Sequence, residues 1–315
     1  MRFFSSVKRK EESRGKRRRN TGMDKAMIIV NPSSGKEEAL DHVKRIEEIL
    51  EEKGYQTKVV QTEKELDATK YCQDACKDEF RLVVSMGGDG TLHETINGMV
   101  DQDHRPLLGI IPLGTVNDFA RALDIPLHIE EAIEVLRSDR TKQVDIGKFN
   151  EDYFVNIVAA GAIAEAVYDV SPDLKTKFGP FAYIVEGVKT LTANSSYPLR
   201  IDYDNKAWEG EALLFLAALT NSTGGFEKMA PEAEVNDGVI HCYVVPKVSM
   251  IRLGSILTAI MRGNLKSVEG VHYFTAEKVR LTSEAELVTN VDGEEGAGLP
   301  VELAILPSHI DVLVP

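Results

Sequence analysis

The stretch Gly87-Gly88-Asp89-Gly90-Thr91 lies between a short apolar run at 81–85 and a helical pattern at 92–100. The apolar run contains β-branched residues and is typical of a buried strand. A strand that passes through glycines into a helix suits anion binding, because backbone N–H groups can approach a phosphate and the helix N-terminus is partially positive. Asp89 could hold Mg²⁺ against such phosphates, directly or through water. Taken alone, a plain strand-to-helix turn explains the glycines equally well.

Strands and helices alternate through the first 145 residues. Strands are expected at 26–30, 55–60, 81–85 and 107–111, with helices ending near Lys53, Lys77 and Val100. This alternation predicts a parallel sheet with both faces covered, whose ligands bind beyond the carboxyl ends of the strands. Polar, glycine-bearing loops follow three of these ends, at 31–35, 87–91 and 113–118. Their expected convergence argues for a nucleotide site, although the first loop has neither the dinucleotide fingerprint nor a Walker motif.

The second half of the chain is rich in β-type segments. Strands are expected at 153–158, 199–203, 212–219, 239–245, 279–281 and 301–306. Frequent hairpin-like connections predict a mainly antiparallel domain. Helical patterns occur at 180–193 and 249–262; the second is apolar and is interpreted as core packing, with a lipid-contacting surface as the alternative. A closing strand at 310–314 could pack on the first domain. The expected organisation is therefore an α/β domain at 23–145 and a β-rich domain at 146–315.

Composition narrows the class of protein. The chain has 315 residues, 43% of them hydrophobic, and a formal net charge of −13. It contains no apolar run long enough to cross a bilayer and no signal-peptide core, which predicts a cytoplasmic protein. Three cysteines, Cys72, Cys76 and Cys242, without metal-type clustering, are expected to be reduced thiols.

The basic N-terminus contrasts with the acidic remainder. Residues 1–22 contain nine Lys or Arg and two Glu, and this composition predicts disorder. Met23 directly precedes the first strand, so we interpret 1–22 as an untranslated or dispensable extension. Binding of anionic lipid headgroups is the alternative function.

With these loops in view, the sequence resembles the diacylglycerol kinase catalytic family, specifically the soluble bacterial lipid kinases. The motifs that carry the resemblance are Asn31-Pro32-x-Ser34-Gly35, Gly87-Gly88-Asp89-Gly90-Thr91-x-x-Glu94, Gly114-Thr115-x-Asn117-Asp118-Phe119-Ala120-Arg121, Pro231-Glu232-Ala233-x-x-x-Asp237-Gly238 and Asp292-Gly293-Glu294. The glycine motif is shared with NAD kinases and phosphofructokinases. Its combination with the third loop is specific for the lipid-kinase group.

The resemblance implies ATP-dependent phosphorylation of a lipid hydroxyl. It implies an α/β nucleotide-binding domain with a parallel sheet, a mainly antiparallel β-sandwich domain, and an active site in the cleft between them. The residues expected to contact ATP are Asn31, Pro32, Ser33, Ser34, Gly35, Thr62, Gly88, Asp89, Gly90, Thr91, Leu92, His93, Glu94 and Thr115. Asp89 would also help to place the catalytic Mg²⁺.

Asp292 and Glu294 match the acidic pair of the family at the catalytic base. In an extended segment, side chains two residues apart could point to the same side. The sequence does not decide which carboxylate takes the proton. Taken alone, Asp292-Gly293 is more typical of an ordinary hairpin turn than of a catalytic site.

The resemblance also implies a structural Mg²⁺ site in the second domain. The matching positions are Glu234, Asp237 and the backbone carbonyl of Val239. Oxygen ligands of this kind suit Mg²⁺. Glu234 departs from the aspartate expected there and is longer by one methylene.

The function expected from the resemblance is phosphorylation of diacylglycerol to phosphatidic acid for phospholipid synthesis, by a homodimer at the membrane surface without nucleic acid. An acidic chain would need a basic patch there; the candidates are Lys175, Lys177, Lys247, Arg252, Arg262 and Lys266. Alternative acceptors are phosphatidylglycerol, a sphingoid base or NAD, the last disfavoured by the third loop. A nucleotide-binding regulator without turnover is disfavoured because Asp89, Asp292 and Glu294 are all present.

Overall fold

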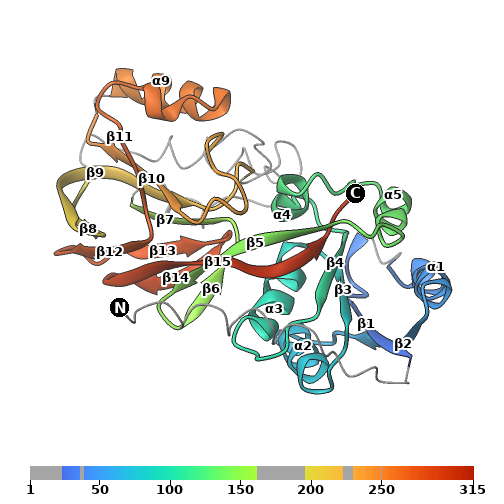
Figure 1. Cartoon of the computed structure of the whole chain (residues 1–315). Helices are drawn as coiled ribbons and strands as arrows, with labels where there is room; N and C mark the ends of the chain where they lie inside the picture. Colours follow the sequence, from blue (N-terminus) through green and yellow to red (C-terminus); the bar gives the residue numbers. More distant parts are fainter. Residues whose placement is uncertain (1–22, 36–38, 162–195, 223–229, 249) are drawn as a thin grey trace, which may run out of the picture.

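The computed structural model describes residues 23–35, 39–161, 196–222, 230–248 and 250–315 (Figure 1). The predicted extension 1–22, the predicted helix at 180–193, and Lys175 and Lys177 lie outside these residues. Among the described helices, none has the length and apolar character needed to cross a membrane.

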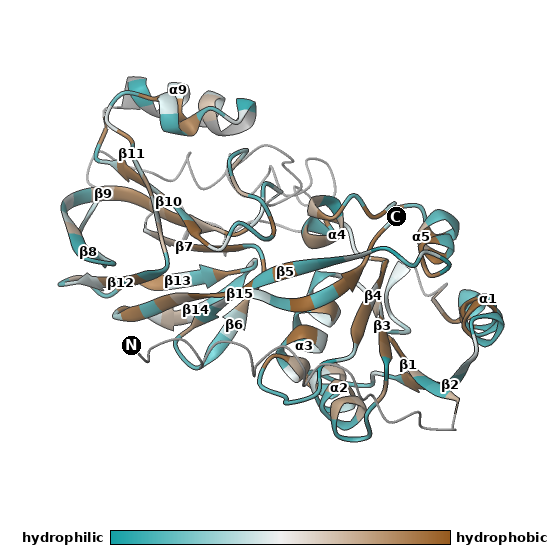
Figure 2. Cartoon of the chain, viewed as in Figure 1, coloured by the Kyte–Doolittle hydropathy of each residue, from teal (hydrophilic) through white to brown (hydrophobic). Residues whose placement is uncertain are grey.

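The first domain contains a parallel sheet, as predicted. Its strands are β1 (Asp24–Val30), β2 (Tyr55–Gln61), β3 (Leu82–Gly87) and β4 (Leu107–Pro112), in the order β4-β3-β1-β2. The two central strands, β1 and β3, are almost entirely buried, because helices cover both faces of the sheet. This burial explains why the sequence shows continuous apolar runs, drawn brown in Figure 2, in place of alternation.

The helices that cover the sheet are α1 (Ala39–Glu52), α2 (Asp67–Lys77), α3 (Asp89–Met99) and α5 (Ile129–Val135). The connection from β1 to β2 runs toward one edge of the sheet, and the connections from β2 to β3 and from β3 to β4 run toward the opposite edge. Right-handed crossovers therefore place α1 on one face and α2 and α3 on the other. The two directions diverge between β1 and β3, which is the position where open α/β sheets bind their ligands.

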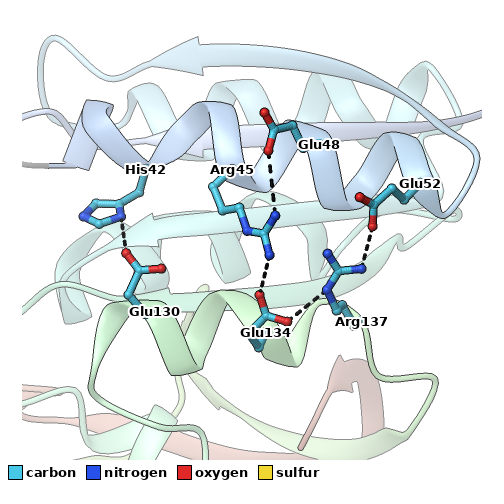
Figure 3. Close-up of polar contacts among 7 residues, drawn as sticks. All are labelled: His42, Arg45, Glu48, Glu52, Glu130, Glu134 and Arg137. Carbon is cyan, nitrogen blue, oxygen red and sulfur yellow. Dashed lines mark hydrogen bonds and ion pairs between the residues drawn. The ribbon is translucent and has the colours of Figure 1, made fainter.

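Ion pairs join α1 to α5 on the surface of this domain (Figure 3). Arg45 and Arg137 both bind Glu134, at 3.0 and 2.9 Å, and Arg137 also binds Glu52 at 2.6 Å. Isolated surface pairs contribute about 0–1 kcal/mol each. Because the two arginines share one carboxylate, these pairs form a network that fixes α5 beside α1.

The second domain is antiparallel, as predicted. Its described strands are β6 (Asp152–Phe154), β7 (Ile157–Gly161), β8 (Tyr197–Tyr203), β9 (Lys206–Ala218), β10 (Ile240–Pro246), β11 (His272–Ala276), β12 (Lys278–Ser283), β13 (Val288–Val291) and β14 (Glu294–Gly298). The helix α9 (Met250–Arg262) agrees with the predicted 249–262, and its Ile256 and Ala259 are buried. The short helix η3 (Leu265–Ser267) follows it.

Two long strands, β5 (Thr141–Phe149) and β15 (Val301–Leu313), pass through both domains (Figure 1). One part of β15 pairs with β12, and Val312 pairs with Leu108 of β4. The sequence predicted two separate strands here, at 301–306 and 310–314; the structure has one strand with a register shift between Leu306 and Ile310. The predicted boundary between residues 145 and 146 falls inside β5.

The single strand predicted at 153–158 is wrong. The chain forms β6 and β7, separated by Val155 and Asn156. The backbone N–H groups of Val155, Asn156 and Ile157 all donate to the carboxylate of Asp292. Neighbouring N–H groups of a strand point to opposite sides, so this convergence requires the strand to break.

Candidate active site

The three glycine-bearing loops meet at the carboxyl edge of the parallel sheet. Asn31 Nδ2 donates to Thr91 Oγ1 at 3.1 Å, which joins the first loop to the second. A Cβ atom added to Gly114 would lie 2.8 Å from the Cα of Gly88, so the second and third loops pack backbone against backbone. Glycine is required on these loops for close approach, and the predicted convergence is present.

Asp89 holds the third loop against the second. Its Oδ2 accepts a hydrogen bond from Asn117 N at 2.8 Å and its Oδ1 accepts one from Asp118 N at 3.0 Å. These N–H groups belong to the start of α4 (Asp118–Ala122). Burial raises the pKa of Asp89 in spite of the two hydrogen bonds. Within the described part of the chain each carboxylate oxygen has one donor, which leaves a second acceptor position that fits a water or a cation.

A cavity of about 290 Å³ opens beside these loops. Its lining residues are Asn31, Ser33, Thr62, Glu63, Lys64, Glu65, Gly90, Thr91 and Glu94. Six of the residues predicted to contact ATP are therefore gathered around one space. Glu94 is also used structurally, because its Oε2 accepts a hydrogen bond from Ala68 N at 3.1 Å, in the first turn of α2.

The other residues predicted to contact ATP are not among those that line this cavity. Pro32, Ser34 and Gly35 belong to the same loop as Asn31, and Gly35 has a positive φ of 63°. The side chain of Leu92 is buried in the first core, and its backbone N–H donates to the Gly88 carbonyl at 3.1 Å, so neither group faces a ligand. Thr115 is exposed on the third loop.

Asp292 and Gly293 form a two-residue turn, so the extended geometry expected for this segment is wrong. Their φ angles are 49° and 98°, and the flanking Val291 and Glu294 pair across β13 and β14. Positive φ at both turn residues is what an Asp-Gly hairpin favours. The two carboxylates consequently have different surroundings.

The carboxylate of Asp292 is surrounded by donors. Val155 N and Asn156 N donate at 2.8 and 2.9 Å, Ile157 N donates at 2.8 Å, and His93 Nδ1 lies 3.2 Å from Oδ2. The side chain is 7% exposed. A carboxylate offers about four acceptor positions, and all four are occupied here.

His93 reaches Asp292 from α3 and is 25% exposed. Burial opposes protonation of the ring, but the hydrogen bond to Asp292 and the charges of Asp292, Glu294 and Asp152 outweigh it and raise the pKa of His93. Groups of the second domain thus favour protonation of a side chain from the first.

A second cavity, of about 480 Å³, lies at the junction of the domains. Its lining residues are Leu66, Thr69, His93, Glu94, Asn97, Asp101, Phe149, Asn150, Glu151, Asp152, Tyr153, Val291, Glu294, Glu295, Gly296 and Ala297. Glu94 borders both cavities. Glu294 Oε1 is 3.6 Å from the position that a Cβ of Gly90 would occupy. The exposed Glu294 therefore stands beside the start of α3, where the two cavities meet.

A buried polar network at the domain junction was not found by sequence reasoning. Ser222 Oγ donates to Asp118 Oδ1 at 2.8 Å, and Thr220 Oγ1 lies 3.1 Å from Asn156 Oδ1. All four side chains are buried. The available signal was the polar sequence that directly follows the apolar run 212–219, since buried polar groups need partners.

The predicted metal residues of the second domain form a local turn. Asp237 Oδ2 accepts from Glu234 N at 3.0 Å, Asp237 Oδ1 accepts from Val239 N at 3.1 Å, and His241 Nε2 lies 2.8 Å from Oδ2. Burial acts to raise the pKa of Asp237, but these contacts lower it overall. Oδ1 has one donor among the described residues, which leaves an acceptor position for a cation. Within the described residues, no three His, Cys, Asp or Glu side chains form a metal-binding cluster.

Two of the predicted basic-patch residues are paired with glutamates. Arg252 binds Glu269 at 3.0 Å, and Lys266 contacts Glu232. Their positive charges are therefore partly neutralised within the domain.

Both halves of the chain match known protein families. Residues 25–149 match the diacylglycerol kinase catalytic domain, and residues 156–314 match the YegS C-terminal NAD kinase beta sandwich-like domain. The diacylglycerol kinase of Staphylococcus haemolyticus is 43% identical over 290 residues, covering 92% of this chain and 88% of that protein. That of Staphylococcus carnosus is 40% identical over 291 residues, covering 92% and 95%.

The fold is similar to that of a solved structure of a diacylglycerol kinase from Bacillus anthracis. The TM-score is 0.80 at 27% identity, over 93% of this chain and 98% of that one. Sequence and structure therefore agree across both domains, and the chain belongs to the diacylglycerol kinase family of lipid kinases.

Proposed function

We propose that this protein transfers the γ-phosphoryl group of ATP to the free hydroxyl of diacylglycerol and so forms phosphatidic acid. The observation that carries the proposal is the meeting of two cavities at Gly90 and Glu294. One cavity is bordered by glycine loops and the start of α3, which suit phosphates. The other is bordered by the hairpin that carries the acidic pair.

We assign the proton-accepting role to Glu294. The acceptor positions of Asp292 are occupied by three backbone N–H groups and His93, so its carboxylate serves to hold the hairpin and the ring. Glu294 is exposed and lines the second cavity. Proton removal is a secondary contribution, because positioning and charge neutralisation dominate phosphoryl transfer.

Mg²⁺ would be held through Asp89, whose oxygens each keep one acceptor position beside the phosphate-binding loops. When bound, the ion neutralises charge on the phosphates. The chain's own contribution is to fix Asp89 with the N–H groups of Asn117 and Asp118. A structural Mg²⁺ at Glu234, Asp237 and the Val239 carbonyl is part of the same proposal.

The charge of the second cavity favours a neutral acceptor. Six of its lining residues are Asp or Glu, and its described lining contains no Lys or Arg. Like charges brought close together cost free energy, so phosphatidylglycerol is a poorer fit than diacylglycerol. We propose that the protein meets this lipid by peripheral association with the membrane surface.

The test is transfer of labelled γ-phosphate from ATP in the presence of Mg²⁺. Diacylglycerol, phosphatidylglycerol, sphingosine and NAD would be offered in parallel, the lipids in mixed micelles. Label in phosphatidic acid, abolished by a Mg²⁺ chelator, is the expected result. Label in another acceptor would identify that acceptor as the substrate in place of diacylglycerol. No label in any of the four acceptors would favour a nucleotide-binding regulator without turnover.

A further inference from the structure

The ring of His93 connects a buried anchor with the second cavity. Nδ1 lies 3.2 Å from the buried carboxylate of Asp292, and the ring lines the cavity. An ionised carboxylate only accepts hydrogen bonds, so Asp292 selects the form of the ring that carries hydrogen on Nδ1. Among the described residues, Nε2 has no hydrogen-bond partner. This nitrogen is therefore available to a ligand.

His93 also has an unusual position with respect to charge. The described residues that line the second cavity include six Asp or Glu, and His93 is the one side chain among them that can become a cation. Asp292 and Glu294 of the β13–β14 hairpin, and Asp152 from β6, stabilise the charged ring, and the pKa of His93 is raised. Glu94 and Asp101 are further carboxylates around this cavity.

The place of His93 along α3 fits a role at the transferred group. Gly90 and His93 are three residues apart and share a face of the helix, and Glu294 Oε1 lies beside Gly90. One helical turn advances about 5.4 Å, which is a short step from the phosphate-binding end of α3 to the ring.

We propose that protonated His93 donates a charged hydrogen bond from Nε2 to the phosphoryl group while it passes from ATP to the acceptor. This inference rests on the proposed function. In the step, the acceptor oxygen bonds to the γ-phosphorus, the bond from that phosphorus to the departing ADP oxygen breaks, and the hydroxyl proton moves to Glu294. His93 keeps its proton throughout, and its charge stabilises the transferring group.

The test is the pH dependence of kcat for transfer to diacylglycerol, measured for the wild type, His93→Gln and His42→Gln. His42 is a matched control, because it is a surface histidine of α1 that pairs with Glu130. We expect wild-type kcat to fall on the alkaline side, above the ordinary histidine pKa of about 6.5. His93→Gln should lower kcat by about 10- to 100-fold at pH 6.5 and abolish this alkaline fall. His42→Gln should behave as the wild type.

A second variant separates charge from structure. His93→Lys keeps a positive charge with a higher pKa, so it should recover part of the lost kcat and move the alkaline fall to higher pH. Equal losses in the glutamine and lysine variants would overturn the proposal, as would an alkaline fall that persists in His93→Gln. An acid-side fall that disappears in His93→Gln would also overturn it, because the ring would then act as a neutral base. A wild type that labels no diacylglycerol would instead refute the proposed function.

Discussion

Two aspartate–histidine pairs of this protein have similar hydrogen bonds but different roles. Asp292 and Asp237 each accept hydrogen bonds from at least two backbone N–H groups and each contact a histidine ring. The donors to Asp237 lie within four residues of it. The donors to Asp292 lie 135 to 199 residues away, and His93 comes from the other domain.

The two histidines show what this difference means. His241 has both ring nitrogens engaged, at 2.8 Å from Tyr273 Oη and 2.8 Å from Asp237 Oδ2, and it is buried. Among the residues that the structure describes, His93 has a partner for one ring nitrogen, and its ring lines a cavity. Local bonds around Asp237 fix one loop. The hydrogen bonds of Asp292 to partners far away in the sequence bring three separate parts of the chain together. We propose that phosphoryl transfer takes place at this site.

Removing the two carboxylates should give the largest contrast. Asp292→Ala leaves three backbone N–H groups and His93 without their acceptor, and we expect a loss of about 3 kcal/mol or more in the free energy of unfolding. We expect kcat for phosphoryl transfer to fall at least about 100-fold, because the hairpin and His93 lose their anchor. Asp237→Ala should cost about 1–2 kcal/mol and reduce kcat less. Denaturant unfolding and phosphoryl transfer measure both effects, and equal losses in the two variants would contradict the comparison.

A smaller effect is expected from substitution of two glycines, Gly114 in the loop 113–118 and Gly254 in α9. A Cβ at Gly114 would lie 2.8 Å from Gly88 Cα and 2.7 Å from Asn117 Oδ1. A Cβ at Gly254 would have no atom of the described residues within 4 Å. Gly114→Ala should cost about 1–3 kcal/mol and raise the KM for ATP about tenfold, because the loops must separate. Gly254→Ala, inside α9, should be neutral or stabilise the protein by up to about 1 kcal/mol. An unchanged KM for ATP in Gly114→Ala would remove the third loop from the nucleotide site.

Added Mg²⁺ tests the proposed structural ion at Asp237. Without nucleotide, saturating Mg²⁺ should stabilise the wild type by about 1–2 kcal/mol, because a ligand that binds the folded state alone shifts the equilibrium toward it. Asp237→Asn should lose most of this gain, which thermal unfolding with and without Mg²⁺ would reveal. The same gain in both proteins would rule out a site at Asp237.

The smallest effect is a pH dependence of opposite sign at the two pairs. The pKa of His93 is raised on folding, so its contribution to stability is complete below the unfolded value near 6.5 and is lost as pH rises through the folded pKa. The pKa of Asp237 is lowered, so its contribution is complete above about 3.9 and is lost as pH falls through the folded pKa. The stability gap between wild type and His93→Gln should therefore shrink from pH 6 to 9. A gap that widens over this range would reverse the assigned sign.

The convergence of the three glycine-bearing loops could be predicted because its signals are local. The loops at 31–35, 87–91 and 113–118 each follow an apolar strand within a few residues. The parallel sheet then brings the three loops together. Motif and topology were sufficient for that step.

The surroundings of Asp292 and Glu294, in contrast, depend on partners far away in the sequence. The break between β6 and β7 exists because Asp292 attracts three consecutive N–H groups from 135 or more residues upstream. The pattern of residues at 153–158 alone could not predict that Asp292 interrupts the strand. The turn at Asp292 likewise separates the surroundings of Asp292 and Glu294, which the spacing of two residues could not show.

The most direct test of the account is phosphoryl transfer to diacylglycerol by Glu294→Gln. Glu286→Gln is the matched control, an exposed residue of the segment between β12 and β13. We predict that Glu294→Gln lowers kcat by about 10²- to 10⁴-fold, the range of general base catalysis, with the KM for ATP and the free energy of unfolding unchanged. Near wild-type kcat in Glu294→Gln would contradict the placement of the chemistry at this junction.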